Sequence, residues 1–525
     1  MQRNQVTGHS SPWSCGTQVA RGLASAALLT LLIHGVAATA QMQSRIQSFS
    51  GHTLGAPLPG MPEAASPLTL RAVNDPVTGV ASFSFAGNEV PPVLHTSPGH
   101  VLQVDYVNAM STHSTETCVD GPCSNMTNLH FHGLHVSPAS PQDDVISMMA
   151  DPGQSLHYEV QIPADQPPGL YWYHTHPHGE SYQQALDGMS GALIVDGIER
   201  YAPEVRSMRQ QVLVLRDAVL KKGDLASTDE ASRVEASNDG CGSEPEAFGR
   251  LLTVNGALRP AIAIQPGEKQ FWRVVNASPD LYVDLQLSGE TMEIIALDGM
   301  PLAFHNPGRR AEIRAHVLLA PGGRVEAIVK GPQRGAHATL RSRCVSTGPD
   351  GDPNPAMVLA DVTDAPESGN ASPLVAAPGL PVYRPIASSR LAALERSTSE
   401  FAVMFTEDRH GFYINGHKYA PDDKPMVTVA VGDYHHWSVV NRTREVHPFH
   451  IHQVHFLAYA QNGAPLQPAE WLDTVNVAPG GRVDMVMDFT DPIIRGLSVF
   501  HCHLLQHEDK GMMAKILFVD PLPRK

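Results

Sequence analysis

Two short signatures recur three times along the chain, in the same order and at nearly the same spacing. The first is a glycine followed five positions later by a large apolar residue and nine positions later by an asparagine. It begins at Gly99, Gly267 and Gly432, which lie 168 and 165 residues apart. A period of this length matches a whole domain rather than a solenoid repeat. The sequence therefore predicts three related units in series.

The second signature is a Pro-Gly turn followed by alternating apolar and polar residues. It occurs at residues 152–156, 321–325 and 479–483. Within the units, apolar residues recur at every second position, as at Leu102, Val104 and Tyr106. This period is typical of half-buried strands, and turn residues separate the runs at short intervals. Each unit is therefore predicted to fold as an all-β sandwich or barrel.

The repeats divide the chain into five expected segments. The expected segments are a leader at residues 1–40, a first unit at 41–200, a second unit at 201–365, a linker rich in Ala, Pro and Ser at 366–400, and a third unit at 401–525. A chain of 525 residues is too long for one ordinary core, so several domains are expected.

The first 40 residues have the pattern of a targeting segment. Arg3 and Arg21 are the only charged side chains there, an apolar run spans residues 23–36, and residues 38–40 fit a small-residue cleavage site. We expect export, to the periplasm or out of the cell, with an uncleaved membrane anchor as the alternative. No other run is long enough to span a bilayer, so the mature form is not expected at a membrane. The formal net charge of −16 argues against nucleic acid as a partner.

Five cysteines remain once the leader is removed, and export implies an oxidising compartment. Cys118 and Cys123 are close enough in sequence to form a small disulfide loop, and Cys241 with Cys344 is a plausible second pair. Cys502 is then left over. An unpaired thiol in an exported protein needs an explanation. Ligation of a metal supplies one, because it protects the thiolate from random pairing.

Cys502 lies in the segment 501–512, which holds three histidines, one cysteine and one methionine. A thiolate with two imidazoles and a weak axial thioether makes a blue electron-transfer copper site. If the segment is a strand, Cys502 points to one face while His501 and His503 point to the other. The segment therefore predicts two metal centres on opposite faces of one strand.

The first and third units share this strand. Residues 169–176 align with residues 496–503, and Thr175 stands where Cys502 stands. The first unit therefore keeps the pair of histidines but has no thiolate. The equivalent stretch of the second unit, residues 338–341, contains no histidine, and this unit is interpreted as a spacer.

Four His-x-His pairs occur, two in the first unit and two in the third. They are His130/His132, His174/His176, His450/His452 and His501/His503. One such pair is a weak signal, whereas four placed symmetrically in two related units can line one interface. Together with His447, His507, Cys502 and Met512, they suit one blue copper and a cluster of about three. Such a cluster can deliver the four electrons that reduce O₂ to water.

These segments resemble the four copper motifs of the multicopper oxidases, in particular those of three-domain laccases and bacterial laccase-like enzymes. The motifs stand at residues 130–133, 174–176, 447–452 and 501–512, and the resemblance covers nearly all of residues 50–525. It implies three consecutive cupredoxin-like Greek-key β-sandwich or barrel domains. It also implies a trinuclear copper cluster between the first and third domains.

The resemblance implies four copper ions and a ligand set for each. The type 1 copper would take His447, Cys502 and His507, with Met512 as the axial ligand. The type 2 copper would take His130 and His450. The two type 3 coppers would take His132, His174, His176, His452, His501 and His503.

The resemblance also suggests which side chains act in catalysis beside the electron-carrying Cys502. Glu508 stands at a position that feeds protons to the cluster in similar bacterial enzymes, and Asp143 or Asp144 is the candidate for a second acid. Solvated loop carboxylates are the alternative for all three. Asp473 matches a segment near the blue site and is given no role.

The histidines off the ligand pattern receive a separate prediction. His135, His178 and His455 are expected to be surface residues or neighbours of ligands.

The predicted function is that of a laccase-like oxidase. It would oxidise a small-molecule donor, a phenol or aromatic amine, one electron at a time and reduce O₂ to water. A cuprous oxidase for copper tolerance is an alternative, but Met357 is the only methionine in residues 350–400, where that activity calls for a methionine-rich insert. A copper carrier without catalysis is disfavoured because no ligand position is missing.

Overall fold

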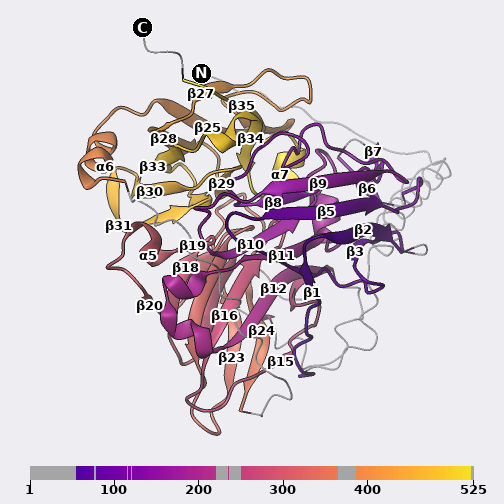
Figure 1. Ribbon diagram of the computed structural model, residues 1–525, viewed down its shortest axis with the longest axis vertical. Helices are drawn as coiled ribbons and strands as arrows, with labels where there is room; N and C mark the ends of the chain where they lie inside the picture. The colour runs from indigo at the N-terminus through magenta and orange to yellow at the C-terminus, as the bar shows by residue number, and fades with distance from the viewer. Residues whose placement is uncertain are drawn as a thin grey trace, which may run out of the picture. The chain divides into compact units, whose positions relative to one another are not determined.

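The computed structural model describes residues 55–75, 78–114, 116–119, 121–219, 234–235, 250–364 and 386–521. The expected leader, Cys241 and most of the expected linker lie outside these residues. Strands dominate the described residues, and the helices are few and short (Figure 1). The predicted all-β fold is therefore confirmed. No helix in the described ranges has the length and apolar character needed to cross a bilayer.

The strands before residue 200 form two main sheets and a small hairpin. The four-stranded sheet has the order β3 (Ala81–Ser84), β2 (Leu68–Asn74), β5 (Val101–Asn108), β9 (Ser155–Gln161). The five-stranded sheet has the order β1 (Glu63–Ala65), β4 (Val93–Thr96), β11 (Ser190–Val195), β10 (Gly169–His174), β8 (His130–His132). The hairpin pairs β6 (Thr117–Cys118) with β7 (Gly121–Pro122).

The strands between residues 209 and 363 form two further sheets. One has the order β14 (Arg250–Val254), β12 (Arg209–Val219), β16 (Lys269–Asn276), β22 (Arg324–Lys330), β18 (Met292–Leu297), β19 (Met300–Pro301), with β20 (Glu312–Arg314) on β18. The other has the order β13 (Val234–Glu235), β24 (Ala356–Thr363), β23 (Ala338–Arg343), β17 (Val283–Leu287), β21 (Val317–Leu319), with β15 (Ala261–Ala263) on β24.

The strands after residue 400 form the last two sheets. One has the order β26 (Gly411–Ile414), β25 (Phe401–Asp408), β28 (Asp433–Asn441), β33 (Arg482–Phe489), β30 (Phe456–Gln461), β31 (Ala464–Leu472). The other has the order β27 (Val427–Ala430), β35 (Met513–Val519), β34 (Gly496–Cys502), β29 (His447–Ile451), β32 (Thr474–Val477). All six sheets fall inside the expected units, whose boundaries stay predictions.

Short helices fill connections between the strands. They are α2 (Ser181–Leu186), α5 (Leu302–His305), α6 (Ser388–Glu395), α7 (Leu505–Asp509) and the 3₁₀ turns η1 (Ile198–Arg200), η2 (Pro203–Ser207) and η3 (Pro492–Ile494). Helix α6 lies in the expected linker, where Leu394 packs against Leu457 and Val486. The described end of that segment is therefore attached to the third unit.

The repeated signatures correspond to one ladder that occurs in all three units. The strand after each signature glycine pairs antiparallel with the strand after each Pro-Gly turn: β5 with β9, β16 with β22 and β28 with β33. The signature asparagine ends the first of these strands and is fully buried. In the third unit, the Asn441 amide donates to the carbonyls of Glu445 and Val477. It recurs because a buried amide satisfies loop carbonyls in each unit.

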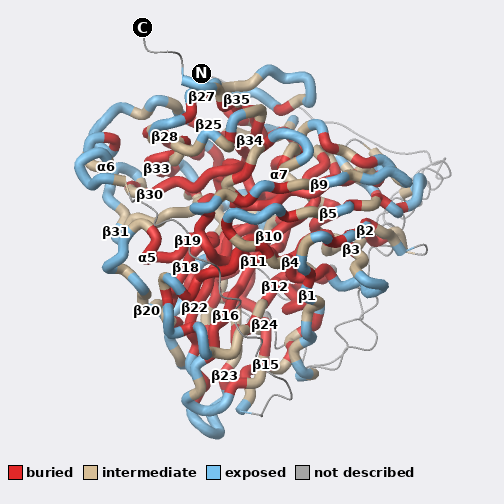
Figure 2. Tube along the Cα trace, viewed as in Figure 1, coloured by how far each residue is buried: buried red, intermediate tan, exposed pale blue. Residues whose placement is uncertain are grey.

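The alternation read from the sequence decides which side chains form the core. In β5, the side chains of Leu102, Val104 and Tyr106 are fully buried, whereas Val101 and Asp105 are exposed. Figure 2 shows the same contrast across the molecule, with buried strands and exposed connecting loops. Each pair of sheets thus provides a rigid support for the side chains at its edges.

Candidate metal centres

The His-x-His pairs lie on adjacent strands of two sheets or at the ends of those strands. In the first unit, His130 on β8 stands opposite His174 on β10, and in the third unit His450 on β29 stands opposite His501 on β34. The same pairing in both sheets reflects the internal repeat. All eight histidines of the four pairs are at most 2% exposed. These eight histidines are therefore not solvated surface residues.

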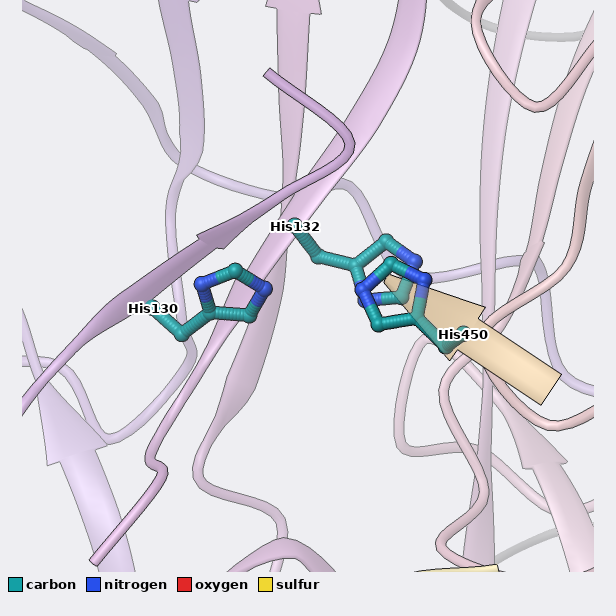
Figure 3. A group of neighbouring side chains, drawn as sticks. All are labelled: His130, His132 and His450. Carbon is teal, nitrogen blue, oxygen red and sulfur yellow. The ribbon is translucent and has the colours of Figure 1, made fainter. Parts of the chain in front are cut away.

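Six of these histidines fall into two triads that share no member. The triads are His132/His174/His503 and His176/His452/His501, and in each the nitrogens lie within 4.8 Å of one another. His130 and His450 are left, and they form a further group with His132, whose ring lies parallel to that of His450 at 3.9 Å (Figure 3). This division matches the one expected for a type 3 pair and a type 2 copper. Ligation of copper by these residues stays a prediction.

Hydrogen bonds at the outer nitrogens fix which ring nitrogen faces inward. Nδ1 of His174 donates to the Thr175 carbonyl, and Nδ1 of His501 donates to the Cys502 carbonyl, both at 2.9 Å. Nδ1 of His450 donates to the Asp473 carbonyl at 2.8 Å. A carbonyl only accepts, so Nδ1 carries the proton and Nε2 keeps its lone pair free.

Unpaired ring nitrogens in these groups fit a metal. The buried nitrogens without a hydrogen-bond partner include His130 Nε2, His132 Nδ1, His174 Nε2, His450 Nε2, His452 Nδ1 and both nitrogens of His503. Burial, with the neighbouring imidazoles, lowers the pKa of these rings below the usual range, so they are neutral. Converging buried lone pairs without a donor are costly, and a bound cation would satisfy them.

A second group surrounds Cys502. The Cys502 Sγ lies 3.4 Å from His447 Nδ1 and 3.9 Å from His507 Nδ1, and the two nitrogens are 3.3 Å apart. The outer nitrogen of His447 has the Thr443 hydroxyl at 2.8 Å. Burial raises the pKa of the Cys502 thiol, so a thiolate there requires a compensating cation. The arrangement suits the predicted blue site.

Met512 belongs to the same buried region. Its side chain is 0% exposed and lies in one apolar cluster with Cys502. The Met512 amide donates to the His507 carbonyl at 2.9 Å, and the Cys502 amide donates to the Met512 carbonyl at 3.0 Å. These bonds hold the Met512 backbone beside His507 and Cys502, two residues of the predicted blue site.

The cysteines behave largely as expected. Cys118 and Cys123 form a disulfide, which confirms that pairing. Cys344 is also disulfide-bonded, while its expected partner Cys241 lies outside the described residues. Among the cysteines of the described ranges, Cys502 alone is free.

Two of the three candidate acids reach the histidines. Asp143 is buried and lies 3.0 Å from His130 Nδ1, and it also accepts from the Phe131 amide. Asp144 instead accepts from the backbone amides of residues 146 and 147, and no contact joins it to a histidine of the described part. The conformation of the loop determines which of the two side chains reaches a histidine. The sequence alone therefore could not distinguish Asp143 from Asp144.

Glu508 lies between two members of one triad. Its carboxylate is fully buried, 3.3 Å from His501 Nδ1 and 3.6 Å from His176 Nδ1. The Ser181 hydroxyl donates to it at 3.3 Å. Burial, together with the charge of Asp509, raises the pKa of Glu508 well above its usual range.

The structure gives Asp473 a place that the sequence did not predict. It was expected near the blue site without a role, but its carboxylate lies 3.1 Å from His132 Nε2 and its carbonyl accepts from His450. Arg324 donates to both Asp473 oxygens, at 2.8 and 2.6 Å. No local pattern reveals this pair, because its members are 149 residues apart.

Of the three histidines off the ligand pattern, His455 is buried, whereas His135 and His178 are half-buried. His135 Nε2 lies 2.6 Å from Nδ1 of the buried His455, whose other nitrogen donates to the Asp298 carbonyl. His178 packs edge-on against Tyr419. His455 lies 3.7 Å from the carboxylate of Asp473, and Asp473 in turn contacts the predicted ligands His132 and His450.

A cavity of about 230 Å³ opens beside the Cys502 group. Its walls include Leu281, Tyr282 and Leu504, the carboxylates of Asp280, Asp352 and Glu445, and the ring of His507. The Glu445 carboxylate lies 3.4 Å from His507 Nε2. A small molecule in this cavity would touch the edge of one His507 ring.

Comparisons with known proteins agree with this geometry. Two multicopper oxidase models match residues 80–200 and 391–521. A laccase of Haloferax volcanii is 26% identical over 81% of this chain and 72% of its own length. The multicopper oxidase mco of Staphylococcus haemolyticus is 23% identical over 83% of both chains. A multicopper oxidase from Campylobacter jejuni, described as a metallo-oxidase, has the same fold, with TM-score 0.65, 20% identity, and coverage of 90% of this chain and 97% of its own.

Proposed function

Because the chain belongs to the multicopper oxidase family, we propose that it works as an exported laccase-like oxidase. Membership makes it a copper-dependent oxidoreductase that uses O₂ and a donor, built from cupredoxin-like β domains. The proposal adds the chemistry of the two sites. Phenols or aromatic amines would lose one electron at a time at a type 1 copper, and a trinuclear cluster would reduce O₂ to water.

One observation carries the proposal: eight buried histidines divide into two separate triads and a remaining pair. Each triad draws residues from both the first and the third unit, so a metal bound there would require the two units together. Copper in these groups would supply the one-electron steps at Cys502 and the four-electron chemistry between the units. A copper carrier would have no use for eight converging imidazoles beside a thiolate site.

The chain's own residues provide a route for the electron. His507 lines the cavity and belongs to the Cys502 group, so a donor that contacts its ring is close to that group. Cys502 is bonded directly to His501 and His503, which belong to the two different triads. The three consecutive residues 501–503 therefore connect the donor site to both halves of the cluster.

Two carboxylates are suited to hold protons near the cluster. Glu508 contacts His176 and His501 from one side, and Asp143 contacts His130 from another. Reduction of O₂ to water consumes protons, and a buried acid can hold one where bulk water does not reach. We assign both as proton donors and do not assign Asp144 this role.

A cuprous oxidase is the second candidate, and the lining of the donor cavity favours it. The side-chain oxygens of Asp352 and Glu445 could contact a cation in this cavity, whereas Asp280 is paired with Arg250, which lines the same cavity. Against it, Met357 is only 3% exposed, so the one methionine of residues 350–400 is part of a core. The apolar residues Leu281, Tyr282 and Leu504 favour an aromatic donor in the same cavity.

Copper content and oxygen uptake test the proposal. The copper-loaded protein should be blue, bind about four coppers per chain, and consume O₂ with a phenolic donor. A stoichiometry of one copper, or no O₂ uptake with any donor, would overturn it. Faster uptake with Cu(I) than with a phenol at equal concentration would select the second candidate.

Export rests on the leader and on the disulfide. The Cys118–Cys123 bond is the kind of cross-link that persists in oxidising compartments. Sequencing the N-terminus of the protein recovered outside the cytoplasm should find residues 1–40 removed. An intact leader in a membrane fraction would support the anchor instead.

A further inference from the structure

We infer that the second unit is a working part of the oxygen site, because its Pro-Gly turn, residues 321–324, positions the type 3 histidines. The inference rests on the proposed function, since it concerns the same cluster. The sequence interpretation of this unit was that of a spacer without ligands. Gly322 in its turn nevertheless contacts the predicted ligands His132 and His503. Arg324 in the same turn binds Asp473, which contacts His132.

The first contact is made by the backbone at Gly322. A Cβ at this position would lie 2.9 Å from Cε1 and Nε2 of His503 and 3.2 Å from Cε1 of His132. His132 and His503 belong to one triad. The backbone of the turn therefore packs against both rings, and only glycine leaves room for them.

The equivalent turns of the other two units make no such contact. Gly153 and Gly480 stand at the same place in the repeat and also have a positive φ, +88° and +66° against +84° at Gly322. A Cβ at Gly153 or Gly480 would have no atom within 4 Å. The glycine at this turn is thus required by backbone conformation in all three units, but by the neighbouring imidazoles in the second alone.

The second contact is made by Arg324, which is 0% exposed and joins all three units. Its guanidinium donates to the Leu170 carbonyl of the first unit, to the Asp298 carbonyl of the second and to the Asp473 carboxylate of the third. With the bond to the Gly322 carbonyl, all five N–H groups are used. A side chain satisfied in this way has one orientation.

Asp473 transmits that orientation to the histidines. Its Oδ1 lies 3.1 Å from His132 Nε2 and 2.8 Å from Arg324 Nη1. Its carbonyl accepts from Nδ1 of His450. With Nε2 held by the carboxylate, His132 presents Nδ1 to the triad, and Nδ1 is one of the buried nitrogens without a partner. Arg324 is therefore a positioning residue that acts through Asp473.

Replacing Arg324 tests the inference. Lysine keeps the charge but cannot donate to both oxygens in parallel, and glutamine loses the charge as well. Loss of such an outer partner weakens metal binding by roughly 10–100-fold. We expect Arg324→Lys, and more strongly Arg324→Gln, to lose cluster copper during dialysis against a chelator while the blue band stays. The electron paramagnetic resonance spectrum should show the type 3 pair uncoupled.

Arg273→Lys is the matched control. Arg273 is also 0% exposed and pairs with Glu326 at 2.9 Å in the same sheet, but no contact joins it to a predicted ligand in the described ranges. If the role of Arg324 is purely structural, variants of Arg324 and Arg273 should show equal decreases in unfolding temperature. The copper content of the cluster should then be unchanged in both. That result, or Arg324 variants that retain cluster copper at wild-type affinity, would overturn the inference.

A second pair of variants separates contact from backbone strain. Gly322→Ala and Gly153→Ala add the same methyl at nearly the same φ, but only the first meets His503 and His132. We expect copper loss and an altered spectrum in Gly322→Ala alone. Equal effects in the two variants would contradict the inference. If the wild-type protein itself binds no cluster copper, the proposed function fails instead, so the two failures are distinguishable.

Discussion

At the scale of single residues, the Cys502 site is specified by side chains that the sequence places close together. Cys502, His507 and Met512 fall within eleven positions, and backbone bonds from Met512 to His507 and from Cys502 to Met512 close the loop that carries them. Only His447 must come from another strand. The burial of Met512 near Cys502 follows from one short segment, while its role as axial ligand stays a prediction.

The Met512→Leu variant tests the axial role. Leucine has a similar volume, so the free energy of unfolding should fall by less than about 1.5 kcal/mol. A thioether donates weakly to copper and leucine does not, so the reduction potential of the blue site should rise. A redox titration followed at the blue absorption band measures it. An unchanged or lower potential would remove Met512 from the ligand set.

Residue identity also limited what could be predicted. Asp143 and Asp144 are chemically equivalent in the sequence, and only the folded loop turns Asp143 to His130 and Asp144 to nearby backbone amides. The Arg324–Asp473 pair was missed for a different reason. Neither residue stands in a copper motif, and their contact is made across two units.

At the scale of elements, β34 joins the two centres. It ends at Cys502 and pairs with β29 so that His501 stands opposite His450 and Cys502 opposite Phe449. Alternation along the strand sends Cys502 into the apolar core and His501 toward the triads. The sequence predicted this because period two needs only local information. Only the His130/His132 pair lies wholly within a strand, because β10, β29 and β34 end before His176, His452 and His503.

The Cys502→Ser variant tests whether copper binding on one face of this strand depends on the thiolate on the other face. A serine hydroxyl is a much poorer copper ligand than a thiolate, so the blue colour and turnover with any donor should be lost. His501 and His503 stay in place, so about three coppers should remain. Metal analysis together with electron paramagnetic resonance checks this. Loss of all copper would mean that the cluster depends on the blue site, contrary to the separate groups seen here.

At the scale of the whole molecule, each triad contains histidines of the first and third units. Arg324 connects the second unit to both through its hydrogen bonds. The division into three units was predictable because two signatures recur in the sequence at intervals of about one domain length. Which surfaces of the units meet was predictable only where histidines marked them. The buried contacts of Leu170, Asp298 and Asp473 with one arginine carry no sequence mark, so the second unit was read as a spacer.

Removal of copper should therefore destabilise the association of the units. Metal that binds the folded but not the unfolded chain stabilises it by about 2.7 kcal/mol when its free concentration is 100-fold above Kd. Without it, eight neutral imidazoles face one another across the first and third units, and six of them have a buried nitrogen without a hydrogen-bond partner. Calorimetry should show that the metal-free protein unfolds at a lower temperature than the copper-loaded one. Because the predicted cluster would bridge the units and the predicted blue site would lie within the third, copper-loaded Cys502→Ser should keep most of that difference. Equal unfolding temperatures with and without copper would show that packing alone holds the units together.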